Sequence, residues 1–141
     1  MHSDVPHTAL AFCCFGVLGL ITFPALAANS LSRDCLVASS WTNKPFEPQT
    51  GTFTAEFDAR PFANDIDGVI GLSSENAIGY TNLAVIVRFF TNGVIDARNG
   101  GTYAAASTIP YSANLTYHFR LVVNVSHHTY SIYVAPTTAR K

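Results

Sequence analysis

Six polar side chains in the C-terminal half of the chain have the chemistry to bind a hydroxyl-rich ligand. Guanidinium, carboxylate, imidazole and amide groups make directional hydrogen bonds, and arginine can make two in parallel. Aromatic rings add stacking surfaces, and four tyrosines are available, namely Tyr103, Tyr111, Tyr130 and Tyr133. An ordinary solvated sheet face crossed by weak ion pairs is the alternative interpretation. The candidate ligand-binding residues are Arg88, Asp96, Arg98, His118, Arg120 and Asn124.

Two carboxylates, Glu56 and Asp58, lie two residues apart in a segment of alternating character. On a strand this spacing puts both on one face, opposite Phe53 and Phe57. Paired carboxylates are the groups that cleavage of a glycosidic bond requires. A solvated face, or a polar strip that contacts carbohydrate without cleaving it, explains the same pair, so we assign no catalytic residue from it.

Two further motifs carry groups that could ligate a metal. The segment 64–68, Asn-Asp-Ile-Asp-Gly, offers the closely spaced oxygen ligands that calcium takes. An EF-hand counted from Asp65 would need glutamate at its twelfth position, where the chain has Asn76. Calcium in another geometry and a turn built from Asx side chains both stay open. His127 and His128 are adjacent and would diverge on extended backbone, so we assign no metal ligands there. We assign no cofactor, and calcium alone stays open.

Hydrophobic periodicity predicts an all-β domain. Alternating or continuously apolar segments indicate strands at 51–59, 67–73, 83–91, 94–98, 117–125 and 129–135. The segment 83–91 is nearly all apolar and is expected to be a central strand. Asn92 and Gly93 are expected to supply the two positive-φ positions of a tight hairpin turn. Short strands separated by Gly, Pro and Asn are typical of a sandwich or barrel.

The hairpin segment 116–134 carries a resemblance to a known family. Its strand Tyr-His-Phe-Arg-Leu-Val-Val turns at Ser-His-His and returns as Tyr-Ser-Ile-Tyr-Val. This pattern resembles the hairpin of concanavalin A-like jelly-roll modules, the lectin, glucanase and laminin G-like group, and the similarity extends from Trp41 to Pro136. The resemblance implies an antiparallel β-sandwich and recognition of glycans. It also implies further strands after the returning one, so the jelly roll is expected to be incomplete at its C-terminus.

The resemblance also bears on the two carboxylates. Glu56 and Asp58 resemble the start of the E-x-D-x-x-E strand of laminarinase-type glucanases, which share the jelly roll. Here the chain continues Ala-Arg-Pro-Phe over 59–62, without the third carboxylate. This departure puts the division of roles between acid and nucleophile in doubt.

The N-terminus predicts secretion. An apolar run from Ala9 to Phe23 precedes Pro24 and then Ala25-Leu26-Ala27, with small residues where a signal peptidase reads them. The run is shorter than the roughly 20 residues that span a bilayer, so a membrane anchor is not expected. We therefore expect a signal-peptide helix over 1–27, a polar lead-in over 28–50 and the sandwich domain over 51–141. The segment before the run lacks Lys and Arg, which departs from the usual signal pattern.

Charge and cysteine content constrain the exported chain. The sequence has eight basic and nine acidic residues, and Asp4 would leave with the signal, so the remainder is formally neutral. Binding to nucleic acid or to an anionic membrane would need a basic face, and neither is expected. Cys13 and Cys14 would also leave, and Cys35 then has no partner in the chain. Either Cys35 is a free or buried thiol, or its partner lies on a missing segment.

These features together predict a secreted, extracellular, non-catalytic module that binds a polysaccharide or adheres to a glycan. Two alternatives belong to other classes. In one, the chain is a fragment of an extracellular glycan hydrolase or lyase. In the other, it is a structural or interaction domain without affinity for glycans.

Overall fold

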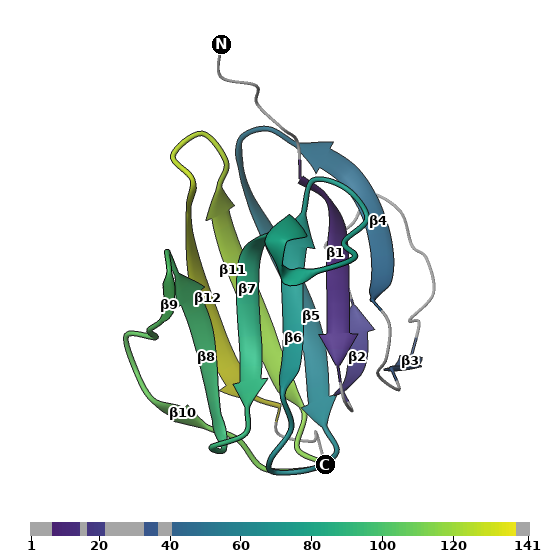
Figure 1. Ribbon diagram of the computed structural model, residues 1–141, viewed down its shortest axis with the longest axis vertical. Coiled ribbons are helices and arrows are strands. Elements are labelled where there is room, and N and C mark those ends of the chain that lie inside the picture. The colour runs from purple at the N-terminus through teal and green to yellow at the C-terminus, as the bar shows by residue number, and fades with distance from the viewer. Residues whose placement is uncertain (1–6, 15–16, 22–32, 37–40, 138–141) are drawn as a thin grey trace.

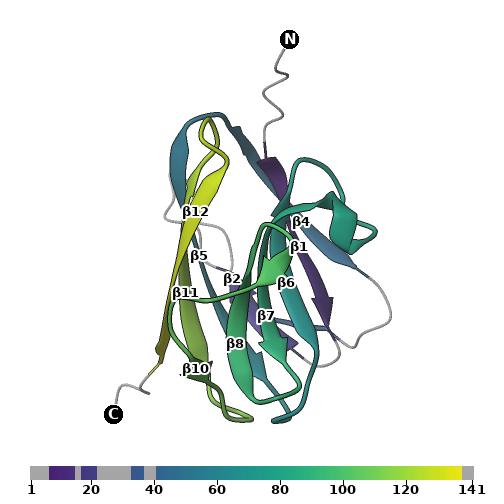
Figure 2. The same cartoon turned by 60° about the vertical axis from the view of Figure 1, so that its left-hand side comes forward.

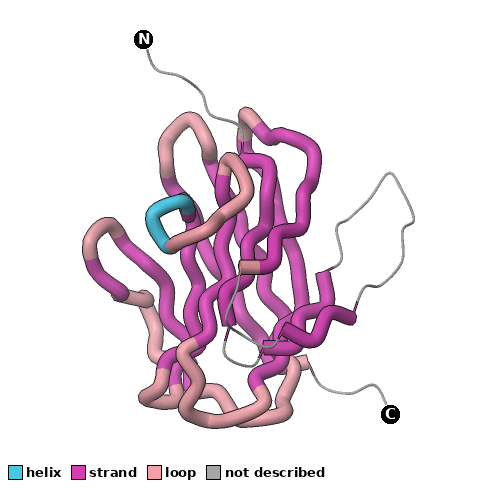
Figure 3. Tube along the Cα trace, turned by 45° about the vertical axis from the view of Figure 1, so that its right-hand side comes forward, coloured by secondary structure: helices cyan, strands magenta, loops and turns pink. Residues whose placement is uncertain are grey.

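The computed structural model describes residues 7–14, 17–21, 33–36 and 41–137, the first three ranges by their backbone alone. Nearly all of the regular structure in these residues is β-strand, and the helix is a single 3-10 turn, η1 (Tyr80–Asn82). Figure 3 shows how strands dominate the trace. No helix in the described ranges is both long enough and apolar enough to cross a membrane. The all-β expectation is confirmed.

The strands form two antiparallel sheets that pack face to face (Figures 1 and 2). The seven-stranded sheet has the order β10-β8-β7-β6-β1-β4, with β9 paired to β8. Its members are β1 (His7–Cys14), β4 (Thr42–Gln49), β6 (Gly68–Ser73), β7 (Leu83–Phe90), β8 (Val94–Asn99), β9 (Thr102–Tyr103) and β10 (Ile109–Pro110). The five-stranded sheet has the order β12-β11-β5-β2-β3. Its members are β2 (Val17–Ile21), β3 (Arg33–Leu36), β5 (Thr52–Pro61), β11 (Tyr117–Asn124) and β12 (Thr129–Pro136).

The core lies between the sheets and follows from the alternation of the strands. On β11 every second residue from Tyr117 to Val123 is buried, and the residues between them are partly or fully exposed. Phe119 of β11 stacks on Phe57 of β5, with ring centroids 5.0 Å apart. Phe89 of β7 crosses from the other sheet and meets Phe119 edge-on at 5.8 Å. Fully burying a phenylalanine contributes about 1.5–3 kcal/mol, so this cluster fixes the sheets against each other.

The predicted strands are found with small shifts in their ends, and β7 is central as expected, between β6 and β8. The hairpin between β7 and β8 differs in its turn. Only Gly93 has positive φ, at 81°, whereas Asn92 does not, and Gly93 N–H donates to the Phe90 carbonyl. Phe90 pairs with Val94, which leaves a three-residue loop. The predicted two-residue turn is therefore wrong, because a type I turn closed by one left-handed glycine needs only one positive φ.

The N-terminal segment also differs from the expected helix. Where its backbone is described it forms β1, between β6 and β4, and β2, between β5 and β3. Short apolar runs are compatible with a helix or with a buried strand, and hydrophobicity alone does not distinguish them. Cleavage before Ala28 lies outside the described residues and stays a prediction.

The polar lead-in predicted for 28–50 contains β3 and β4. β4 lies at one edge of the seven-stranded sheet and contains Pro45 and Pro48. Proline cannot donate to a sheet ladder and is tolerated mainly on edge strands, so sequence periodicity did not identify this strand. Cys35 lies in β3, and its side chain is outside the described residues.

Candidate functional site: the outer face of β5, β11 and β12

The outer face of the five-stranded sheet, turned away from the core, carries three rows of polar side chains on neighbouring strands. Antiparallel register places His118 of β11 opposite Asp58 of β5. Two residues along β11, Arg120 lies opposite Glu56 on one side and Tyr133 of β12 on the other. Glu56 and Asp58 share this face, while Phe57 is buried on the opposite one, as the sequence predicted. Three strands thus deliver charged and aromatic groups to one surface.

Arg120 is held by an aromatic ring and keeps its donors free. Its guanidinium carbon lies 4.3 Å from the ring centroid of Tyr133, which is itself 51% exposed. Among the described residues it has no hydrogen-bond acceptor or ion-pair partner. Stacking on a ring contributes about 0.5–1 kcal/mol at an exposed site and leaves the edge of the guanidinium open. Arg120 can therefore make a planar, two-point contact with a ligand.

His118 and Asp58 form a hydrogen-bonded pair beside Arg120. Nδ1 of His118 lies 2.7 Å from Oδ1 of Asp58, and the two side chains are 43% and 25% exposed. Because a carboxylate oxygen accepts, Nδ1 carries the proton in this bond and the ring is oriented with Nε2 left for other contacts. An exposed pair contributes little to stability, so its value lies in orienting the imidazole.

Asn124, the third predicted residue on β11, is used by the chain itself. Its side-chain oxygen accepts the backbone N–H of His127 and the hydroxyl of Ser126, both at 3.1 Å. The residue that closes this turn, His128, has a positive φ of 53°. The Asn124 side chain thus holds the β11–β12 turn, as asparagine commonly does.

The other three predicted residues lie on the seven-stranded sheet, away from His118 and Arg120. Arg88 of β7 and Asp96 of β8 face each other and make two parallel hydrogen bonds, Nε to Oδ1 at 3.0 Å and Nη2 to Oδ2 at 2.7 Å. The Arg88 guanidinium also lies 3.8 Å from the ring centroid of Phe90 and 3.6 Å from that of Tyr103. The hydrogen bonds to Asp96 raise the pKa of Arg88 above its ordinary value. Both partners are about 15% exposed, so the pair is already satisfied internally.

Arg98 of β8 lies next to this pair. Its Nε donates to the Gly100 carbonyl at 2.9 Å, and its guanidinium carbon lies 5.8 Å from the Tyr103 ring centroid. The six predicted residues therefore divide between the two sheets and do not form one row. The sequence pattern identified outward-facing polar positions correctly but carried no information on which sheet each strand joins.

Two contributors to the outer face of β5, β11 and β12 were not among the six. From sequence, Glu56 is only half of a carboxylate pair, and Tyr133 is only one of four tyrosines that could stack on a ligand. The alternation of β12, in which Tyr133 points opposite to Ile132 and Val134, was the signal that could have placed it outward.

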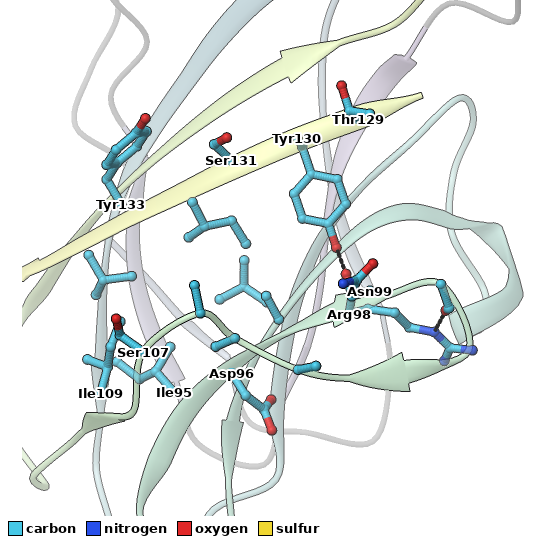
Figure 4. A pocket seen from close by; sticks show the side chains of 18 of the residues that line it. Ile95, Asp96, Arg98, Asn99, Ser107, Ile109, Thr129, Tyr130, Ser131 and Tyr133 are labelled. Atoms are coloured by element: carbon cyan, nitrogen blue, oxygen red, sulfur yellow. Dashed lines mark hydrogen bonds between the residues drawn. The ribbon is translucent and has the colours of Figure 1, made fainter. Parts of the chain in front are cut away.

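A separate pocket of about 600 Å³ opens between the two sheets, at the side where β12 is the last strand. Figure 4 shows Thr129, Ser131 and Tyr133 along β12 on one side and Ile95 and Ile109 on the other. Tyr130 crosses this gap, and its hydroxyl donates to the Arg98 carbonyl. Burial raises the pKa of the Tyr130 hydroxyl.

The segment 64–68, for which the sequence left both calcium ligation and an Asx turn open, makes contacts between loops. Asn64 Oδ1 accepts the backbone N–H of Ala113 at 2.6 Å, and the Tyr111 hydroxyl accepts the N–H of Ile66 and donates to the Phe90 carbonyl. Within residues 41–137, no three His, Cys, Asp or Glu side chains converge as metal ligands would. The Asn64 side chain thus stabilises a loop contact, as Asx side chains commonly do.

Comparison with known proteins gives one distant similarity. No protein-family model matches the chain, and no solved structure matches it. An 86-residue stretch, 60% of the chain, is 29% identical to a gellan lyase from a Bacillus species, and it covers 4% of that enzyme's length. The chain is therefore a two-sheet, all-β domain with partial and distant similarity to a small part of a gellan lyase.

Proposed function

We propose that this domain is a non-catalytic carbohydrate-binding module that attaches to an extracellular polysaccharide through the outer face of β5, β11 and β12. The observation that carries the proposal is the Arg120 guanidinium, which lies over the exposed ring of Tyr133 with its donors unused by the described residues. A fixed guanidinium beside an aromatic ring pairs directional hydrogen bonding with a stacking surface.

The neighbours of Arg120 supply complementary groups. Glu56, opposite Arg120 on β5, offers carboxylate oxygens that accept hydrogen bonds from sugar hydroxyls. His118 is oriented through Nδ1 by Asp58 and presents Nε2. Strands in a sheet are about 4.8 Å apart and same-face residues about 6.7 Å apart along a strand, so the groups span a surface wide enough for several contacts. An extended polymer can use a flat, open face of this kind.

The similarity to a gellan lyase supports a polysaccharide as ligand and makes gellan the first probe. The extracellular setting depends on the predicted secretion signal. Arg88 and Asp96 are left out of the proposed site because each is already bonded to the other.

Titration calorimetry of the domain with gellan, and with neutral and acidic polysaccharides in parallel, tests the proposal. We expect saturable binding to at least one of them, weakened about tenfold or more by Arg120→Ala and by Tyr133→Ala. Arg98→Ala is the matched control, because it removes the same side chain from the other sheet and should leave binding unchanged. Absence of binding to every polysaccharide, or equal losses in Arg98→Ala and Arg120→Ala, would overturn the proposal.

A second candidate, a fragment of a glycan-cleaving enzyme, is favoured by the name of the similar protein. It predicts slow turnover of gellan, measured as new chain ends, that Glu56→Gln or Asp58→Asn abolishes. Binding without turnover in the same titrations supports the non-catalytic module.

A further inference from the structure

β12 has a free edge whose hydrogen-bonding groups can be assigned. It is the last strand of the five-stranded sheet, and no described strand pairs with its second side. Thr137 N–H donates to the Thr116 carbonyl at 2.7 Å. These two residues are opposite each other in the β11–β12 register, so they form a hydrogen-bonded pair. Hydrogen-bonded and non-bonded pairs alternate along an antiparallel ladder. The backbone groups of Ser131 and Tyr133 therefore point to β11, and those of Tyr130, Ile132 and Val134 point to the free edge.

The pocket runs along this edge. Every residue from His128 to Val134 lines it, although a pocket touching only one face of a strand would contact alternate residues. Consecutive residues from Ile95 to Asn99 of β8, and Gly100 after it, line the opposite wall. Seven residues of extended chain span roughly 23 Å. The pocket is thus a channel beside the backbone of β12, with the length of a short strand.

The surfaces that border the channel are mostly uncharged. β12 contains no Lys, Arg, Asp or Glu. Of the charged residues lining the channel, Asp96 is paired with Arg88 and Arg98 donates to the Gly100 carbonyl. Charged side chains are the usual means by which edge strands resist pairing, and this edge lacks them. Ile132 and Val134 are only partly covered by the core, and Ile109 and the alanines at 104–106 face the same space.

We propose that the channel binds an extended, uncharged segment of another polypeptide, which pairs with the edge of β12 as an added strand. Its backbone meets the groups of Tyr130, Ile132 and Val134, and its alternate side chains, small or β-branched, point down between the sheets. This is strand addition, in which the main chain supplies affinity and alternating pockets supply specificity. The uncharged channel matches an uncharged segment of about seven residues.

A second copy of the domain does not fit this edge. In Figure 1 the connection from β9 to β10 lies outside β12, so the seven-stranded sheet projects past the edge. Ala104 to Ser107 of that connection, with Ile109 of β10, form part of the channel wall. Two domains joined through β12 would bring both projecting layers into the same space. A single extended segment carries no second layer and avoids this overlap.

Hydrogen exchange followed by NMR tests the proposal on the intact domain. The probe is a capped seven-residue peptide of alternating threonine and valine. We expect it to slow exchange of the amides of Tyr130, Ile132 and Val134 at least tenfold, with much smaller changes at Ser131 and Tyr133, which already bond to β11. A peptide with glutamate in place of valine is the charge control, and one N-methylated at alternate residues is the backbone control. Both should fail to protect these amides.

Ile132→Pro removes the central edge N–H at a position where an edge strand accepts proline, and Ile132→Val keeps it. We expect the proline variant to weaken peptide binding tenfold or more relative to the valine variant. If the proline variant does not fold, the N-methylated peptide tests the same contact from the other side. The proposal would be overturned if the unmodified peptide does not bind, or if it binds without protecting the three edge amides. It would also be overturned if a concentration-dependent dimer protects these amides instead.

Discussion

The two outer faces of the sandwich use the same three kinds of side chain for different purposes. On the seven-stranded sheet, Arg88 lies between two aromatic rings and makes two hydrogen bonds to Asp96. On the five-stranded sheet, Arg120 lies over the single ring of Tyr133 and makes no hydrogen bond or ion pair with the carboxylate opposite it, Glu56.

The difference shows that residue type alone does not define a binding site. What matters is whether the hydrogen-bonding capacity of the arginine is already used. Arg88 is mostly buried and its carboxylate partner is in place, so the cluster stabilises the β7–β8 hairpin. Arg120 is exposed and its donors are open, so it is available to a ligand.

The largest effect we expect comes from breaking the buried pair. Asp96→Ala leaves the Arg88 guanidinium mostly buried without its anion, and removal of one partner of a buried pair costs about 3 kcal/mol. Urea unfolding measures this loss. Asp58→Ala is the matched change on the other face, where the pair with His118 is more exposed, and we expect a loss below about 1 kcal/mol. Equal losses would remove the distinction between the faces.

A second test removes the aromatic ring from each face. Tyr103→Ala takes away the ring 3.6 Å from the Arg88 guanidinium, and we expect it to lower the free energy of unfolding by about 2 kcal/mol. Tyr133→Ala should lower it by about 0.5 kcal/mol, since the ring is half exposed, while weakening polysaccharide binding. Thermal unfolding of both variants, with calorimetric titration, separates the two roles. A Tyr103→Ala variant that keeps its stability but loses binding would reverse the assignment.

The sequence predicted the strands of this fold better than their arrangement. Alternation placed Glu56 and Asp58 outward and Phe57 inward, because side-chain direction on a strand depends only on local period. The separation of Arg88 from Arg120 depends on which strands become neighbours, and that is decided by long-range packing of residues such as Phe89 and Phe119. The two prolines of β4 interrupt the alternation by which a strand is predicted from sequence. The type of turn at Gly93 depended on the φ angle of Asn92, which the sequence did not determine.

The candidate site was predictable in composition but not in extent. Four tyrosines fitted a stacking role from sequence alone, yet the structure gives them different environments. Tyr111 is buried and its hydroxyl donates to the Phe90 carbonyl, Tyr130 is partly buried and donates to the Arg98 carbonyl, and Tyr133 is exposed. Only the assembled sheets show which tyrosine shares a face with an unsatisfied arginine.

Tyr130 connects the two sheets, because its side chain reaches from β12 to the Arg98 carbonyl of β8. Tyr130→Phe keeps the ring and removes the hydroxyl, so the Arg98 carbonyl loses its donor in this partly buried hydrogen bond. We expect a loss of about 1 kcal/mol in the free energy of unfolding by urea. Tyr133→Phe is the control on the same strand, and it should change stability by less than half as much. If Tyr130→Phe leaves the free energy of unfolding unchanged, the two sheets are held together at this edge by apolar contacts alone.

The smallest effect at neutral pH, and one that grows in alkali, concerns the hydroxyls of Tyr111 and Tyr130. Burial raises the pKa of Tyr111 and of Tyr130, so the folded domain holds their protons more tightly than the unfolded chain does. Their contribution to stability is therefore complete below the unfolded tyrosine pKa of about 10 and is lost as pH rises through the folded values. Urea unfolding at a series of pH values should show stability falling above about pH 10. Tyr111→Phe and Tyr130→Phe should each flatten that fall, and a slope unchanged in both variants would locate the alkaline sensitivity elsewhere in the molecule.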